Sequence, residues 1–182
     1  MAKLNSFREL RVYQELRRLH LAIHEESLRF PKFEMYELGS QLRRSSNAAC
    51  AILAEGWGSS HTNIYLEAIN RSKGELRETQ HHLDMAHAKG YFDQPRWTEF
   101  DSAYEVCDKM LERLHERLSE WRGTTRTGYE VKEGPSCYGA YGSAGEWAAL
   151  VEIMANVMNE FALSPSTLHP PPSTCGCYNR SP

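Results

Sequence analysis

The stretch that decides the fold reads RRSSNAACAILAEGWGSSHTNIY, from Arg43 to Tyr65. It joins a run rich in serine and alanine to a Glu-Gly-Trp-Gly-Ser-Ser break, after which Thr62 opens a new helical pattern. Small residues on a helix let a neighbouring helix approach closely, and glycine commonly ends a helix. The stretch therefore predicts a closely packed helix, a turn and a second helix.

Helical patterns continue on both sides of this stretch. The predicted helices run from a Ser6–Glu9 capping box to Pro31, from about Met35 to Glu55, from Thr62 to Gly90, and from Asp93 and Pro95 to Trp121, before Gly123. Apolar residues in the last two recur in alternating steps of three and four, which is typical of antiparallel neighbours with shallow crossings. We therefore expect an all-α, antiparallel up-down-up-down four-helix bundle over residues 1–122.

Residues 123–182 are a C-terminal extension whose Gly, Ser, Thr and Pro content predicts a linker and tail. A second capping box, Ser143 to Glu146, precedes an apolar stripe that predicts one further short helix at about 144–162. The candidate partner-binding residues on this stripe are Trp147, Leu150, Val151, Met154 and Phe161. Because such a helix is unstable alone, it is expected to pack on the bundle, a sister subunit or a partner.

Composition places the chain among ordinary globular proteins, with 41% hydrophobic and 25% charged residues in 182. The run from Ala48 to Ala54 is far shorter than the roughly 20 apolar residues of a membrane span, and the opening MAKLNSFREL lacks an apolar signal core. We therefore expect a cytoplasmic protein with no membrane partner. Cys50 and Cys107 fall within helical patterns, so buried reduced thiols are expected.

Charge is segregated along the chain although the net charge is only −3. Bases outnumber acids by nine to six from Met1 to Asn47, and acids outnumber bases by eight to five from Tyr91 to Arg122. Folding the predicted helices places basic residues of three helices at one height, in a basic belt. The belt also includes His20, and its Lys and Arg residues form the candidate nucleic-acid-binding set: Arg17, Arg18, Arg43, Arg44, Arg71 and Lys73.

Two interpretations of the basic belt remain open. The belt can bind an anionic partner, because arginine makes bidentate contacts with phosphate. Alternatively, it is neutralised by acids at a similar height, namely Glu75, Glu112 and Glu116. Arg44 lies deepest in the small-residue stretch and is expected to be the most structural of the six.

Several patterns suggest metal sites but fail on geometry or ligand number. The Glu-x-x-His sequences at 78–81 and 112–115 resemble the ligand pairs of di-iron bundles, yet they lie off the apolar seams and on the order of 10 Å apart in height. His20 and His24 are four residues apart but lack a third ligand. In the tail, possible zinc ligands without compact spacing are Cys137, His169, Cys175 and Cys177. We expect no metal or cofactor.

Enzymatic motifs are also missing from the sequence. The glycine-containing break at 55–62 could offer backbone amides to a phosphate, but it lacks the Gly-Lys-Ser/Thr ending of a P-loop and a preceding strand. An activated nucleophile and paired seam carboxylates are likewise absent. We therefore expect no catalytic residues and no enzymatic activity.

The segments FRELRVYQ, FPKFEMYELGSQLRRSS, AEGWG, SHTNIYLEAINRSKGELRE and HAKGYF occur in this order between Ser6 and Trp121. In this combination the chain resembles the bacterial four-helix-bundle family named for proteins encoded in intervening sequences of 23S ribosomal RNA genes. The resemblance implies an up-down bundle that assembles as a homopentamer and has no established enzymatic activity. The residues that match the family are scaffold residues: Arg44, Asn47, Glu55, Gly56, Glu75, Gly90 and Tyr91.

A related bundle, the accessory variability determinant of diversity-generating retroelements, is similar in architecture and uses a basic pentamer surface to bind a reverse transcriptase and nucleic acid. By this resemblance we expect a non-enzymatic homo-oligomeric adaptor that binds structured RNA, or a nucleic-acid-processing protein such as a reverse transcriptase, through the basic belt. The alternative is a protein-interaction scaffold that docks partners through its C-terminal helix and does not bind nucleic acid.

Overall fold

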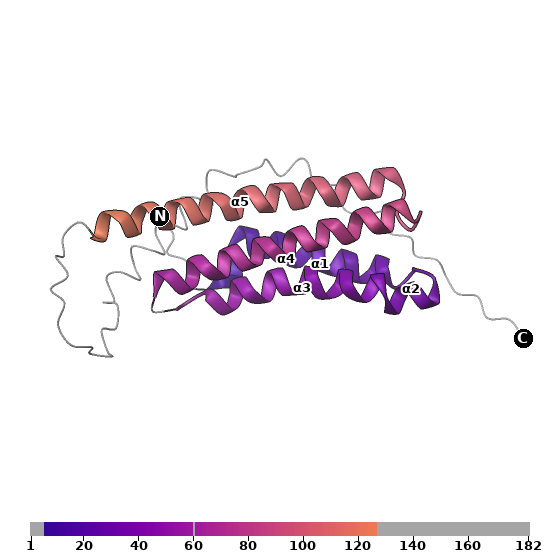
Figure 1. Ribbon diagram of the computed structural model, residues 1–182, viewed down its shortest axis with the longest axis horizontal. Coiled ribbons are helices and arrows are strands. Elements are labelled where there is room, and N and C mark those ends of the chain that lie inside the picture. The colour runs from indigo at the N-terminus through magenta and orange to yellow at the C-terminus, as the bar shows by residue number, and fades with distance from the viewer. Residues whose placement is uncertain (1–5, 60, 127–182) are drawn as a thin grey trace, which may run out of the picture.

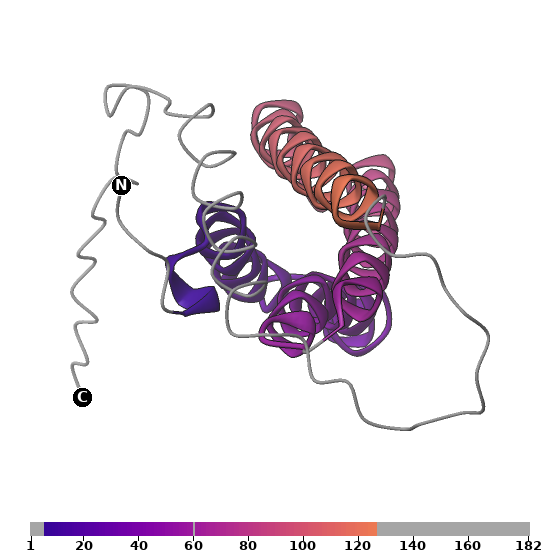
Figure 2. The ribbon, with the colours of Figure 1, turned by 90° about the vertical axis from the view of Figure 1, so that its left-hand side faces the viewer.

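The computed structural model describes residues 6–59 and 61–126, and the side chains of these residues up to 122. In chain order the elements are a 3-10 turn η1 (Phe7–Glu9), α1 (Arg11–Ser27), α2 (Lys32–Tyr36), α3 (Leu38–Gly56), α4 (Thr62–Ala88) and α5 (Gln94–Arg126). The long helices α1, α3, α4 and α5 lie side by side (Figure 1). Viewed end-on, α4 lies between α3 and α5, and α1 lies on the other side of α3 (Figure 2). The predicted all-α antiparallel bundle is confirmed.

The core consists of one apolar seam from each long helix, as the helical spacing predicts. The following side chains are at most 2% exposed: Leu16, Leu19, Ile23, Leu42, Ala49, Leu53, Tyr65, Ile69, Leu76, Leu83, Phe100, Tyr104, Leu111 and Leu118. Burying a large apolar side chain contributes about 1.5–3 kcal/mol. These seams are therefore the main source of the bundle's stability.

Small residues bring α3 and α4 close together, which confirms the packing interpretation of the small-residue stretch. Ser45 and Ala49 are buried, and Gly56 ends α3 so near α4 that an added Cβ would lie less than 3.0 Å from Ala68 Cβ. Gly58 follows with a φ of 79°, a conformation that favours glycine. The Glu-Gly-Trp-Gly break is therefore the predicted turn.

The N-terminal boundary differs from its prediction. The Ser6 hydroxyl accepts from the Arg8 N–H at 3.3 Å and caps only the 3-10 turn, rather than a continuous helix. The chain then extends at Leu10, whose side chain is fully buried, and α1 begins at Arg11. Burial of Leu10 against the core accounts for the extended residue at this junction.

The second predicted helix is divided in two. Lys32 starts the short helix α2, and the backbone breaks at Glu37, with φ −92° and ψ −96°, before α3. Arg43 Nη2 donates to the Met35 carbonyl at 2.9 Å. In an unbroken helix that carbonyl would accept from the N–H of residue 39, so the Arg43 bond replaces the one lost at the break.

The ends of α4 and α5 combine a confirmed prediction with a wrong one. Gly90 has a φ of 77°, its N–H donates to the His87 carbonyl, and the Tyr91 N–H donates to the Ala86 carbonyl, which is a Schellman C-cap. Asp93 then caps α5 by accepting from the Arg96 N–H at 2.9 Å. The prediction that this helix ends before residue 123 is wrong, because α5 continues through Arg126.

The C-terminal prediction remains a prediction. The short helix expected at about 144–162 and its candidate partner-binding residues lie outside the described residues. None of the helices in residues 6–59 and 61–126 combines the length and the apolar character needed to cross a membrane.

Candidate nucleic-acid interface

Hydrogen bonds between the helices fix how far along the bundle each basic residue lies. His20 Nδ1 lies 2.9 Å from Ser46 Oγ and sets the register of α1 against α3. Ser72 Oγ donates to the Ala49 carbonyl at 2.7 Å and sets the register of α3 against α4. The height of every other residue along the bundle can be counted from these two pairs.

The predicted common height of the six basic residues is wrong for two of them. Counting from these pairs at about 1.5 Å per residue, Arg17 of α1 and Arg71 of α4 lie at nearly one level, as do their neighbours Arg18 and Lys73. Arg43 and Arg44 of α3 lie about 10 Å farther toward α2. The turn between α1 and α3 includes the extra helix α2, which the sequence prediction did not count.

Arg43 is a structural residue. Its Nη1 donates to the Ser27 hydroxyl at 2.8 Å and its Nη2 to the Met35 carbonyl at 2.9 Å, so the guanidinium joins α1, α2 and α3. Arg44 is exposed, in contrast to the expectation that it would be the most structural of the six. The two adjacent arginines have exchanged the predicted roles because α3 turns residue 43 toward α1.

Lys73 is also occupied. It is 8% exposed on α4, and its ammonium pairs with the Glu112 carboxylate on α5. The hydrogen bond from Lys73 lowers the pKa of Glu112 below its usual value. For this residue the interpretation of internal neutralisation is confirmed, and a buried lysine with its own carboxylate is a poor phosphate ligand.

Arg18 is held more loosely. Its Nε donates to Glu15 at 2.9 Å on the same helix, with 46% of the arginine side chain exposed. Exposed pairs of this kind contribute about 0–1 kcal/mol. A phosphate could therefore compete for Arg18 at little cost.

Arg17, Arg44 and Arg71 are exposed and have no hydrogen-bond or ion-pair partner within residues 6–59 and 61–126. They come from α1, α3 and α4. Three free guanidinium groups on adjacent helices form the part of the predicted belt that the structure leaves available; we call them the free arginines.

The surroundings of Arg71 differ from those of the other two. Arg71 lines a pocket of about 90 Å³ between the end of α3 and the start of α4. The other lining residues are Ile52, Glu55, Gly56, Ile64, Glu67 and Ala68. Two carboxylates beside one guanidinium reduce its attraction for phosphate.

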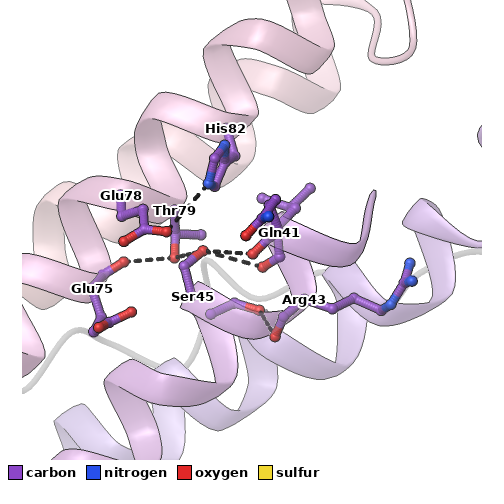
Figure 3. A network of polar contacts seen from close by, with 9 residues as sticks. Gln41, Arg43, Ser45, Glu75, Glu78, Thr79 and His82 are labelled. Carbon is purple, nitrogen blue, oxygen red and sulfur yellow. Dashed lines mark hydrogen bonds and ion pairs between the residues drawn. The ribbon is translucent and has the colours of Figure 1, made fainter. Parts of the chain in front are cut away.

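A line of buried hydroxyl groups connects α3 with α4. Thr79 Oγ1 lies 2.9 Å from Ser45 Oγ and 2.8 Å from the Glu75 carbonyl, and Ser45 Oγ donates to the Gln41 carbonyl at 3.2 Å (Figure 3). With Ser72, these side chains form the hydroxyl ladder, and all of its hydroxyls are buried and bonded. The ladder supports the helices that carry Arg44 and Arg71.

The candidate metal patterns are dispersed in the structure. His82 contacts Glu78 at 3.4 Å, and His115 contacts Asn70 at 3.3 Å. Nowhere in the described part of the chain do three His, Cys, Asp or Glu side chains gather as a metal site would require. The four possible zinc ligands of the tail, residues 137, 169, 175 and 177, lie outside that part.

The two helical cysteines are buried free thiols, as predicted. Burial raises the pKa of Cys50 and of Cys107 to about 12. Both are therefore protonated at neutral pH, and a protonated buried thiol is a weak nucleophile.

One polar cluster is not predictable from the sequence. Glu34 of α2 is 4% exposed and accepts from Lys89 Nζ at 2.5 Å and from the Tyr91 hydroxyl at 3.4 Å. The hydrogen bond from Lys89 lowers the pKa of Glu34. The partners are more than 50 residues apart in the chain, so no local spacing indicates the pair that fastens α2 to the turn after α4.

Residues 8–113 match the family described as 23S rRNA-intervening sequence protein. The chain belongs to that family. The family match covers the helices that carry all six predicted basic residues, and it confirms the resemblance found in the sequence. A comparison with curated proteins finds no match.

Proposed function

We propose that this family member is a non-enzymatic, homo-oligomeric adaptor that binds structured RNA, or a protein of an RNA-processing complex, through its free arginines. The observation that carries the proposal is the exposure of Arg17, Arg44 and Arg71 on adjacent helices without partners among the described residues. Guanidinium groups suit phosphate oxygens because they donate two parallel hydrogen bonds.

The contributions of the free arginines are unequal. Arg17 and Arg44 are the principal phosphate ligands, since Arg71 shares its pocket with Glu55 and Glu67. Arg18 can act as a further phosphate ligand when its guanidinium releases the Glu15 carboxylate. Arg43 and Lys73 act as supports, because their donors are already bonded within the bundle.

Neutralisation within the chain explains how an acidic protein can retain a basic surface. Acids of α5 pair with bases of the same chain, as in Glu112 with Lys73, Asp108 with Arg77 at 3.7 Å and Glu99 with Arg96 at 2.5 Å. Much of the negative charge is therefore compensated locally. The family resemblance adds the expectation of a homopentamer, in which the free arginines would be repeated on every subunit.

The test is binding of the full chain to a structured RNA hairpin over a salt series. For each phosphate contact, log affinity falls by about 0.7–0.9 for every unit increase in log salt. We expect the double variant with Arg17→Gln and Arg44→Gln to weaken the salt dependence of log affinity by nearly the amount for two phosphate contacts. Arg71→Gln should weaken it by less than the amount for one contact. The matched control is Arg29→Gln, because the Arg29 side chain is 74% exposed but lies beyond the end of α1, outside the basic belt.

Failure to bind RNA at low salt, or an equal loss of affinity in the Arg29 control, would refute the role of the free arginines. The oligomer is tested separately by light scattering of the purified chain. A mass of one subunit at micromolar concentration would contradict the homo-oligomer and leave the RNA measurement standing.

A further inference from the structure

Exposed apolar side chains are concentrated on α1 and α2. Leu21 on α1 and Leu28, which caps the C-terminal end of α1, are 47% and 50% exposed and lie seven residues apart, about two helical turns. Phe33 and Tyr36 on α2 are 66% and 67% exposed. We call these four residues the α1–α2 stripe. Elsewhere in the described residues the exposed large apolar side chains are Ile64 and Met85.

The α1–α2 stripe is separate from the core. The opposite side of α1 is buried in the bundle through Leu16, Leu19 and Ile23. Exposed apolar side chains that gather on consecutive segments and are not used in the core mark an interaction surface. Basic residues flank the stripe: Arg17 precedes Leu21, Lys32 precedes Phe33, and both are exposed.

We propose that the α1–α2 stripe is the docking site of the chain's own residues 143–161, which we call the C-terminal segment. Its apolar residues from Trp147 to Phe161 recur at helical spacing, and as a helix they would extend over about 21 Å. The segment needs an apolar surface to be stable, and the stripe is such a surface within the same chain.

The end of α5 places the C-terminal segment within reach. Arg122 Nη1 donates to Asn63 at 2.5 Å, so α5 finishes at the end of the bundle where α4 starts and α1 begins (Figure 1). The interhelical bonds place Leu21 about 25 Å back from Arg126 along the bundle. A glycine-containing coil of the length of residues 127–146 has a root-mean-square reach of about 25 Å.

Charge gives the docking a direction. Residues 133–179 contain no lysine or arginine, and the C-terminal segment has a glutamate near each end, Glu146 and Glu160. Arg17 lies on α1 one helical turn before Leu21, at the end of the stripe nearer Arg126 and therefore nearer the start of the segment. A segment running parallel to α1 would therefore place Glu146 near Arg17.

Hydrogen–deuterium exchange of the full chain without RNA tests the docking. Amides of residues 147–161 are expected to exchange at least about tenfold more slowly than an unstructured peptide. Leu21→Glu with Leu28→Glu should remove this protection, whereas Ile64→Glu, at a position 51% exposed on α4, should preserve it. Exchange at the unprotected rate in the wild type, or equal protection in both variants, overturns the proposal.

A charge exchange and a dilution series complete the experiment. Arg17→Glu should increase tail exchange several-fold, and adding Glu146→Arg should restore the protection; no restoration refutes the parallel arrangement. Protection that stays constant over a dilution series in which light scattering shows the chain passing to single subunits supports docking within one chain, and protection lost as the subunits separate assigns the segment to a second copy and overturns the proposal. RNA is absent throughout, so the docking and the proposed RNA binding can fail independently.

Discussion

Replacing Gly56 with alanine tests the close packing of α3 on α4. The added Cβ would lie less than 3.0 Å from Ala68 Cβ and 3.1 Å from Tyr65 Cδ2. Because carbon atoms in contact prefer about 3.8 Å, the helices would have to separate by at least about 0.8 Å. Overpacking of this kind costs about 1–3 kcal/mol, against a gain of less than about 1 kcal/mol in helix propensity at the last position of α3.

We therefore expect Gly56→Ala to lower the free energy of unfolding by about 2 kcal/mol, or the midpoint of thermal unfolding by roughly 8 °C. Gly74→Ala is the matched control, since Gly74 lies within α4 and an added Cβ would have no atom within 4 Å apart from those of its own chain neighbours and helix backbone. It should stabilise the protein by up to about 1 kcal/mol. Urea unfolding of the two full-length variants measures both effects. If Gly56→Ala is as stable as the wild type, the close approach of the helices is refuted.

Two further measurements examine the polar contacts. Glu112→Met should destabilise the fold more than Lys73→Met, because the first leaves a buried ammonium without its partner and the second replaces it with an apolar side chain; equal losses in urea unfolding would contradict this order. Burial, and then the neighbouring His24, lower the pKa of His20 below 6.5, so the unfolded chain binds its proton more readily and stability should fall as pH drops below 6.5. His20→Asn should flatten this part of the stability–pH curve, and an unchanged curve would exclude His20 as its source.

The bundle was predictable because its seams depend on local spacing. The steps of three and four in α4 and α5 place residues such as Leu76 and Leu111 in the core whatever the details of the turns. Asp93 and Gly90 mark boundaries through local hydrogen bonds, so these ends were also predictable. The break at Glu37 was not, because Arg43 stabilises it from α3.

The basic belt was predictable only in composition. Sequence indicates which residues are basic, but a change of one position turns a side chain by about 100° around the helix. Arg43 and Arg44 show this: the first is bonded inside and the second is exposed. Lys73 could be assigned to pairing from the nearby acids, but its burial depends on how α4 and α5 approach each other.

The hydroxyl ladder has a consequence for how the helices can be aligned. Alanine and serine side chains are short, so where they line α3 their apolar contacts oppose a slide along α4 only weakly. After such a slide, Ser72 and Thr79 would lose the Ala49 carbonyl and the Ser45 hydroxyl as partners. Each buried polar group left unbonded costs about 1–3 kcal/mol, so the ladder adds to the preference for one alignment that Leu42, Leu53 and Gly56 also favour. The same bonds therefore keep Arg44 and Arg71 at a constant spacing.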